Sequence, residues 1–105
     1  MLIDILGTEY KIICDSDYLK EINADGICKE YDKEIVIRDI ADMLTPEDKT
    51  ETKELREKEV LRHELIHAFF SESGLDDYSG NEQLVNWLAI QFPKMIQAFR
   101  EADAL

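Results

Sequence analysis

The stretch Val60–Phe70, with the sequence VLRHELIHAFF, predicts the central helix of this protein and organises the interpretation of the rest. Leu61, Leu65 and the pair Ala68-Phe69 recur at helical spacing and form an apolar stripe. The stretch also contains His63-Glu64-x-x-His67, and these two histidines are the only ones in the 105 residues. Because residues four apart lie one turn apart on the same face of an α-helix, both imidazoles can reach one ion.

This spacing predicts a zinc site. Zinc accepts neutral imidazole nitrogen at about 2.0–2.1 Å, and two histidines on a rigid helix meet that requirement with little rearrangement. Glu64 follows the first histidine directly, where its carboxylate can take a proton from a water that the metal polarises. We therefore predict that His63 and His67 are metal ligands and that Glu64 is the general base of a hydrolytic reaction.

A hydrolytic zinc site usually has a third protein ligand and an open water position. No third histidine exists, so the ligand must be a carboxylate, and the candidates that follow the motif are Glu72, Asp76, Asp77 and Glu82. Glu72 is five residues beyond His67, a rotation of about 500° along the helix, which is about 140° beyond one full turn. Its side chain therefore points well away from the histidine face. Glu82 begins the next predicted helix and can face the first one if the two pack antiparallel, so we favour it. Ser79-Gly80-Asn81-Glu82 also fits a capping box, in which Glu82 would instead bind the Ser79 backbone N–H.

The composition limits the kinds of partner. The chain has 24 acidic and 12 basic residues, a net charge of −12, which argues against binding to nucleic acid. No apolar stretch is long enough to span a membrane, and the N-terminus lacks the features of a signal peptide. Cys14 and Cys28 have no metal-type spacing and are expected to be reduced thiols in a cytoplasmic protein.

The first part of the chain shows the alternation and the turn residues of β-strands. Four strands are expected, at Leu2–Leu6, Tyr10–Cys14, Ile27–Tyr31 and Glu34–Arg38. Asp15–Ala24 is expected to be irregular, with one helical turn around Leu19, and Asp25-Gly26 is expected to form a turn. We therefore predict a small, mostly antiparallel sheet of three or four strands.

Helical signals dominate the second part. Thr45 and Pro46 are typical of a helix N-cap and first helical position, and the motif helix is expected from about Thr52 to Ser73. A last helix begins near Ser79 or Asn81, and its apolar stripe continues through Pro93. We predict either one kinked helix or two that meet at Phe92. The chain is thus expected to be one α+β domain, residues 1–105, with the sheet packed on the motif helix and a kinked C-terminal helix.

The motif and its surroundings resemble a known family. His63-Glu64-x-x-His67 followed by Asn81-Glu82 is similar to the gluzincin branch of the zincin metallopeptidases. Val60 to Phe92 resembles small zincin-like proteins of bacteriophages and prophages and, more distantly, peptidases of the ImmA/IrrE type. The resemblance implies an edge strand that holds an extended peptide. The interval from His67 to Glu82 is shorter than in the large gluzincins. Both histidines are predicted metal ligands, so none is left to stabilise the oxyanion that forms during hydrolysis. Tyr78 or Tyr31 is the candidate for that role.

The predicted function is zinc-dependent hydrolysis of a peptide bond in a peptide or protein substrate. Asn86 and Trp87 are candidates for contacting the metal ligands and holding them in orientation. Trp87 is also a candidate for an ordinary residue of the hydrophobic core. An alternative from another class is an acidic phage or prophage protein that occupies a basic host surface in place of DNA. A further alternative is a zincin fold whose metal is not catalytic.

Overall fold

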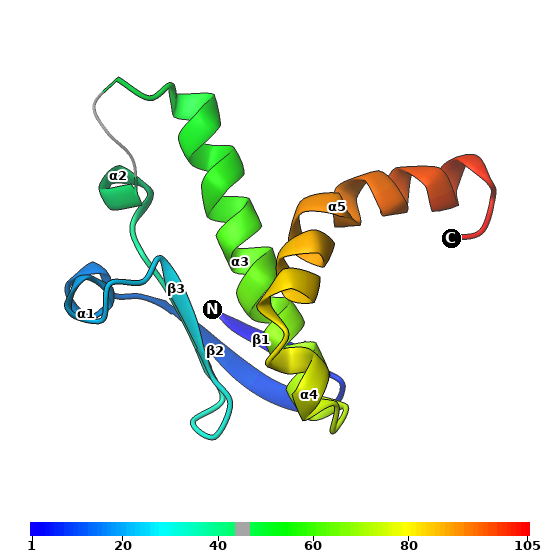
Figure 1. Cartoon of the computed structure of the whole chain (residues 1–105), viewed down its shortest axis with the longest axis horizontal. Helices are drawn as coiled ribbons and strands as arrows, with labels where there is room; N and C mark the ends of the chain where they lie inside the picture. The colour runs from blue at the N-terminus through cyan, green and yellow to red at the C-terminus, as the bar shows by residue number, and fades with distance from the viewer. Residues whose placement is uncertain (44–46) are drawn as a thin grey trace.

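The computed structural model describes residues 1–43 and 47–105, which form an α+β fold with a four-stranded sheet beside one long helix (Figure 1). The predicted N-cap Thr45 and first helical residue Pro46 lie outside the described residues. In the described part, the fold class that the sequence predicts is confirmed.

The sheet consists of β1 Leu2–Ile5, β2 Thr8–Cys14, β3 Gly26–Lys29 and β4 Glu34–Ile37. Its order is β1-β2-β4-β3, so β1 and β3 are the edge strands. The pairs β1–β2 and β3–β4 are antiparallel, whereas β2 and β4 run parallel. The sheet is therefore mixed, although two of its three pairings are antiparallel.

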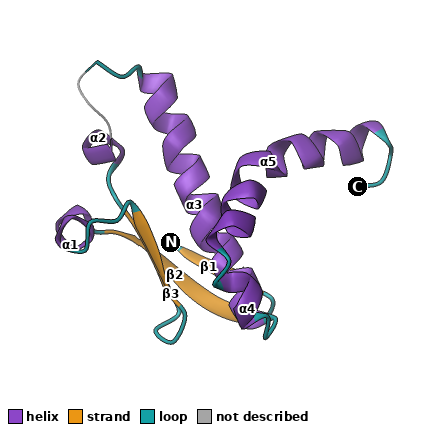
Figure 2. Ribbon diagram, viewed as in Figure 1, coloured by secondary structure: helices purple, strands orange, loops and turns teal. Residues whose placement is uncertain are grey.

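The core lies between this sheet and the motif helix, α3, which spans Thr50–Glu72. Ile5, Tyr10 and Ile35 are buried on the sheet and meet Ala68 of α3. This contact explains the register of the strands, because a shift by one residue would turn these side chains to the opposite face. The short helix α1, Ser16–Glu21, lies at the far end of the sheet (Figure 2).

The other helices are α2 Ile40–Met43, α4 Asp76–Ser79 and α5 Glu82–Glu101. The motif helix ends as predicted at Gly74, which has φ +73° and is followed by a Leu75 N–H that donates to the Phe70 carbonyl. None of the helices in the described part of the chain has the length and apolar character that a membrane span requires.

Pro93 lies inside α5, which continues through it as one bent helix (Figure 2). A proline cannot donate the N–H that the carbonyl four residues earlier would accept. That carbonyl belongs to Ala89, and the guanidinium Nε of Arg62 donates to it at 2.7 Å. Arg62 thus satisfies the acceptor that the proline leaves, which allows the helix to continue where the sequence left open a break.

Candidate metal centre

His63 and His67 point to the same spot from consecutive turns of α3. Their Nε2 atoms are 3.1 Å apart, and the two rings meet edge to face with centroids separated by 4.8 Å. Both side chains are largely buried, with exposed fractions of 20% and 14%. Burial lowers the pKa of His67, against the opposing effect of Glu82, and so favours the neutral ring that a metal requires.

Glu82 completes this group from the first turn of α5. Its Oε2 atom lies 3.0 Å from Nε2 of His63, and its Oε1 atom lies 3.0 Å from Nε2 of His67. Asn81, whose Oδ1 accepts from the Leu84 N–H, is the N-cap that directs the helix and its first residue toward α3. The capping-box alternative is not realised, because the Ser79 N–H donates to the Leu75 carbonyl.

The other candidate carboxylates do not join this group, although Asp76 lines the cavity in front of it. Glu72 lies on the sheet side of α3, where it accepts from the Tyr10 hydroxyl and the Lys33 ammonium, each at 2.7 Å. Asp76 and Asp77 are exposed in the first turn of α4. In the described part of the chain, the one group of three or more His, Cys, Asp or Glu side chains arranged to hold a metal is His63, His67 and Glu82.

The donor set fits a divalent cation such as zinc. Two imidazole nitrogens on one tetrahedral zinc are separated by about 3.3 Å, close to the observed 3.1 Å. Two imidazole nitrogens and both oxygens of one carboxylate converge here, and a proton or a cation between them makes that approach favourable. Glu82 is 62% exposed, so the group is open to solvent on one side, as a site that must also bind water requires.

Glu64 is the one buried charged residue in the described part of the chain, with 5% of its surface exposed. Its Oε2 atom has no hydrogen-bond partner, and its Oε1 atom lies 3.8 Å from Nε2 of His63. Burial, with a smaller contribution from the charge of Glu82, raises the pKa of Glu64 to about 7. A buried carboxylate with one oxygen free of hydrogen bonds and with a raised pKa is suited to accept a proton.

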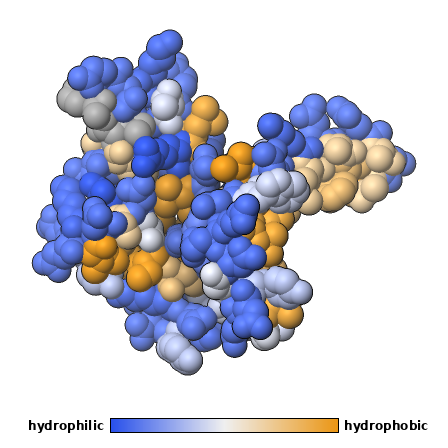
Figure 3. Space-filling view, viewed as in Figure 1, coloured by the Kyte–Doolittle hydropathy of each residue, from blue (hydrophilic) through white to orange (hydrophobic). Residues whose placement is uncertain are grey.

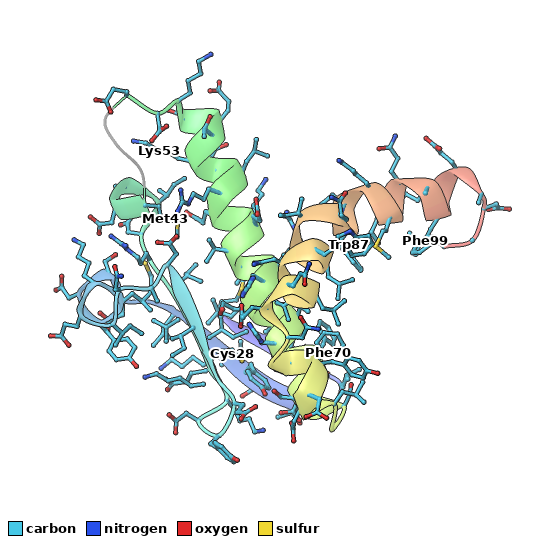
Figure 4. All side chains as sticks on the ribbon, in the orientation of Figure 1. Cys28, Met43, Lys53, Phe70, Trp87 and Phe99 are labelled. Carbon is cyan, nitrogen blue, oxygen red and sulfur yellow. The ribbon has the colours of Figure 1, made fainter. Side chains whose placement is uncertain are left out.

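A cavity of about 490 Å³ opens in front of this group. It lies between α3, the edge strand β3 and the α4–α5 turn, the region where Figure 4 places Cys28. Carboxylates of Glu30, Glu64, Asp76 and Glu82 line it, without a lysine or arginine from the described residues. Its electrostatic potential therefore favours positively charged occupants.

Gly26, the first residue of β3, allows the strand to approach the motif helix. A Cβ atom at this position would lie 2.9 Å from Cγ1 of Val60 and 3.1 Å from Cγ of Glu64. The sequence predicted a turn at Asp25-Gly26, which is wrong at Gly26: the residue lies in a strand and its role is close packing. Its missing side chain brings β3 alongside the candidate general base.

Ser79 contacts the second ring nitrogen of His67, Nδ1, and the sequence does not predict this role. Its Oγ atom lies 3.3 Å from Nδ1 of His67 and donates to the His67 carbonyl at 3.3 Å. When Nδ1 carries the ring proton it donates to Ser79, which leaves the Nε2 lone pair facing Glu82. Ser71 extends this network, since its Oγ donates to Glu30 at 2.7 Å and lies 3.4 Å from Ser79 Oγ.

The remaining predicted site residues are not among those that line the cavity. Tyr78 is half exposed, and its ring lies against Phe70 with centroids 6.0 Å apart. Tyr31 is 92% exposed at the β3–β4 turn. Asn86 lines a smaller adjoining cavity with His63 and Glu64, and Trp87 is half exposed rather than core. The oxyanion role for Tyr78 stays a prediction.

Comparisons of the chain with protein-family models, with curated proteins and with solved structures gave no significant match.

Proposed function

We propose that this protein is a metal-dependent hydrolase that cleaves a peptide bond, with His63, His67 and Glu82 as the ligands of zinc. The observation that carries the proposal is the approach of one Glu82 carboxylate to both imidazole Nε2 atoms beside the buried carboxylate of Glu64, whose Oε2 atom has no hydrogen-bond partner. A structural role alone does not require a buried carboxylate oxygen without a partner, because such a group costs stability.

A cation bound by these three residues would act as a Lewis acid, which would lower the pKa of a coordinated water toward about 7 and polarise the carbonyl of the scissile bond. Glu64 takes the proton of the attacking water as the carbon–oxygen bond forms. It then gives that proton to the nitrogen of the scissile bond, which leaves as an amine. Burial raises the pKa of Glu64, which makes its carboxylate a better proton acceptor than an exposed one for the first of these transfers.

The edge strand β3 is the proposed place for the substrate. One side of β3 pairs with β4, and its residues Gly26, Ile27 and Cys28 line the cavity in front of Glu64. An extended peptide can add to the free side of such a strand through main-chain hydrogen bonds. That arrangement would hold the peptide beside the proposed base.

We propose that the reaction takes place in the cytoplasm. Cys14 and Cys28 are free thiols in the structure. Burial raises the pKa of Cys28 to about 12, so its thiol stays uncharged in the cavity and does not compete as a nucleophile. Free thiols suit a reducing compartment.

The test compares the parent protein with Glu64→Gln in zinc content and in cleavage of a peptide library followed by mass spectrometry. We expect equal zinc and a loss of at least about 100-fold in cleavage, because the amide cannot accept the proton. Glu54→Gln, which removes an exposed carboxylate from the same helix, is the matched control and should retain activity.

Other outcomes are distinguishable. Zinc without cleavage in the parent would indicate a metal that is not catalytic. Salt-sensitive binding to a basic partner that Glu64→Gln leaves unchanged would indicate an acidic binding protein instead. Equal cleavage by the parent and by Glu64→Gln would contradict the assigned base.

A further inference from the structure

The second half of α5 leaves the rest of the molecule. Residues 93–101, which we call the arm, project away from the sheet and from α3 (Figure 1). Short isolated helices, below about 12–15 residues, are marginal in water, so an apolar helix of this kind is normally stabilised by packing. Figure 3 shows apolar residues along the projecting arm.

The apolar residues of α5 form one continuous stripe. Its members recur at alternating spacings of three and four residues, as in helices that pack against other helices: Val85, Leu88, Phe92, Met95 and Phe99. The first of them, Val85, is buried. Phe92 and Phe99 further along are 41% and 40% exposed. The face that α5 turns toward its own chain therefore continues onto the arm, where Phe99 is exposed and Met95 is only partly buried.

A groove lies beside the base of the arm. It has a volume of about 460 Å³ and lies between α3 and α5. Apart from Arg62 its lining is apolar: Leu65, Ile66, Phe69, Phe70, Leu88 and Phe92. Phe69 is 44% exposed, so the groove is an open apolar surface rather than part of the core. The arm of the same chain points away from it (Figure 4, where Phe99 marks the outer half of α5).

The charges favour a second copy of the chain as the partner. The arm, residues 93–101, contains Lys94, Arg100 and Glu101, a charge of +1, so the rest of the chain carries −13. The arm is thus complementary in charge to the body of another copy. The same negative body would be repelled by an anionic membrane surface.

The exposed apolar area is large enough to form the centre of a dimer interface. The groove and the arm together offer three exposed phenylalanines and six partly buried apolar side chains. At about 150–250 Å² for a whole aromatic side chain, the three phenylalanines, each about two-fifths exposed, offer roughly 200–300 Å² per copy, to which the six partly buried side chains add. A standard interface of roughly 800 Å² per partner surrounds such an apolar centre with a polar rim.

We infer that two copies of the chain pair through α5 in antiparallel orientation, each placing its arm in the groove of the other. Such a contact is self-complementary, since the same two surfaces meet twice about a two-fold axis. Met95, Ile96 and Phe99 of one copy cover Phe69, Leu88 and Phe92 of its partner. The metal centres lie outside this contact.

Sedimentation velocity of the full chain across a concentration series tests the pairing. We expect a species of twice the 12.2 kDa chain mass for the parent and a monomer for Phe99→Asp. Ile90→Asp is the matched control, because Ile90 is 48% exposed on the same helix but lies about 200° around it from Phe92, and it should stay dimeric.

Phe69→Asp, on α3, should also give a monomer, and circular dichroism of each variant confirms that it is folded. A parent that remains monomeric at all concentrations would overturn the inference. So would equal dissociation by Phe99→Asp and Ile90→Asp, which would indicate a general effect of charge. Binding of the monomeric parent to phosphatidylcholine vesicles would assign the arm to lipid instead.

Discussion

The Oε1 atom of Glu82 lies 3.0 Å from Nε2 of His67, although the two residues belong to different helices. This contact depends on the α4–α5 turn, in which Asn81 caps α5 and directs its first residue back to α3. Fifteen positions separate the two residues, and the short α4 occupies the interval. The compact turn explains how a carboxylate reaches the histidines although only fifteen positions separate Glu82 from His67.

Replacement of Glu82 by glutamine should weaken zinc binding by at least about 100-fold, because a neutral amide is a poorer ligand than a carboxylate. Competition with a chromogenic chelator measures the affinity. Glu101→Gln removes the same charge from the other end of α5 and should leave the affinity unchanged. Equal affinities for the two variants would remove Glu82 from the ligand set.

Replacement of Ser79 by alanine removes the partner of His67 Nδ1. The ring then loses its fixed tautomer and orientation, for which a cost of about 10- to 100-fold in metal affinity is typical. The fold should be retained, because Ser79 is a short side chain at the end of α4. Ser73→Ala, at the end of α3, is the control. Unchanged affinity in Ser79→Ala would show that the hydroxyl does not position the ring.

Replacement of Gly26 by alanine should destabilise the domain by roughly 1–3 kcal/mol, because the new Cβ atom meets Val60 and Glu64 at short distance. Urea denaturation measures the free energy of unfolding. Gly80→Ala is the comparison, since a Cβ there would make only ordinary contacts, the nearest at 3.6 Å. An equal loss of unfolding free energy in both variants would show that the packing of β3 does not depend on its close approach to α3.

The domain should lose stability at acidic pH, in part because Glu72 becomes protonated. The Lys33 ammonium, with the Tyr10 and Thr8 hydroxyls, lowers the pKa of Glu72 to about 2 from its ordinary value of 4.5. A carboxylate with a lowered pKa stabilises the fold above pH 4.5, and this contribution is lost as the pH falls toward 2.

Melting temperatures of Glu72→Gln between pH 2 and 6 provide the test. We expect the variant to be less stable than the parent at pH 6 and to show a smaller fall toward pH 2. Glu9→Gln, an exposed strand residue, should follow the parent. A parallel fall in Glu72→Gln and the parent would contradict the pairing of Glu72 with the sheet.

The sequence predicted most of the elements and the centre of the site. The four-residue spacing of His63 and His67 depends only on helix geometry, and the Asn81 cap is a local signal. The parallel pairing of β2 and β4 was not predicted, because alternation shows which face a strand buries but not which strand lies beside it.

The supporting residues of the site were harder to predict. The sequence around Gly26 predicts a turn, because close approach between a strand and a helix far along the chain leaves no local pattern. Ser79 contacts His67 across an interval of twelve residues, and a serine before a helix is usually explained by capping. Only the rule that a metal-binding histidine needs a partner for its second nitrogen could have indicated it.

Zinc content tests the central claim most directly. Protein purified without chelators is dialysed, and its metal is measured by mass spectrometry beside that of His63→Ala. We predict about one zinc per chain in the parent and loss of it in the variant, because His63 and His67 share the ion. No retained metal in the parent, even after it is loaded with zinc, or equal metal in His63→Ala would contradict the account.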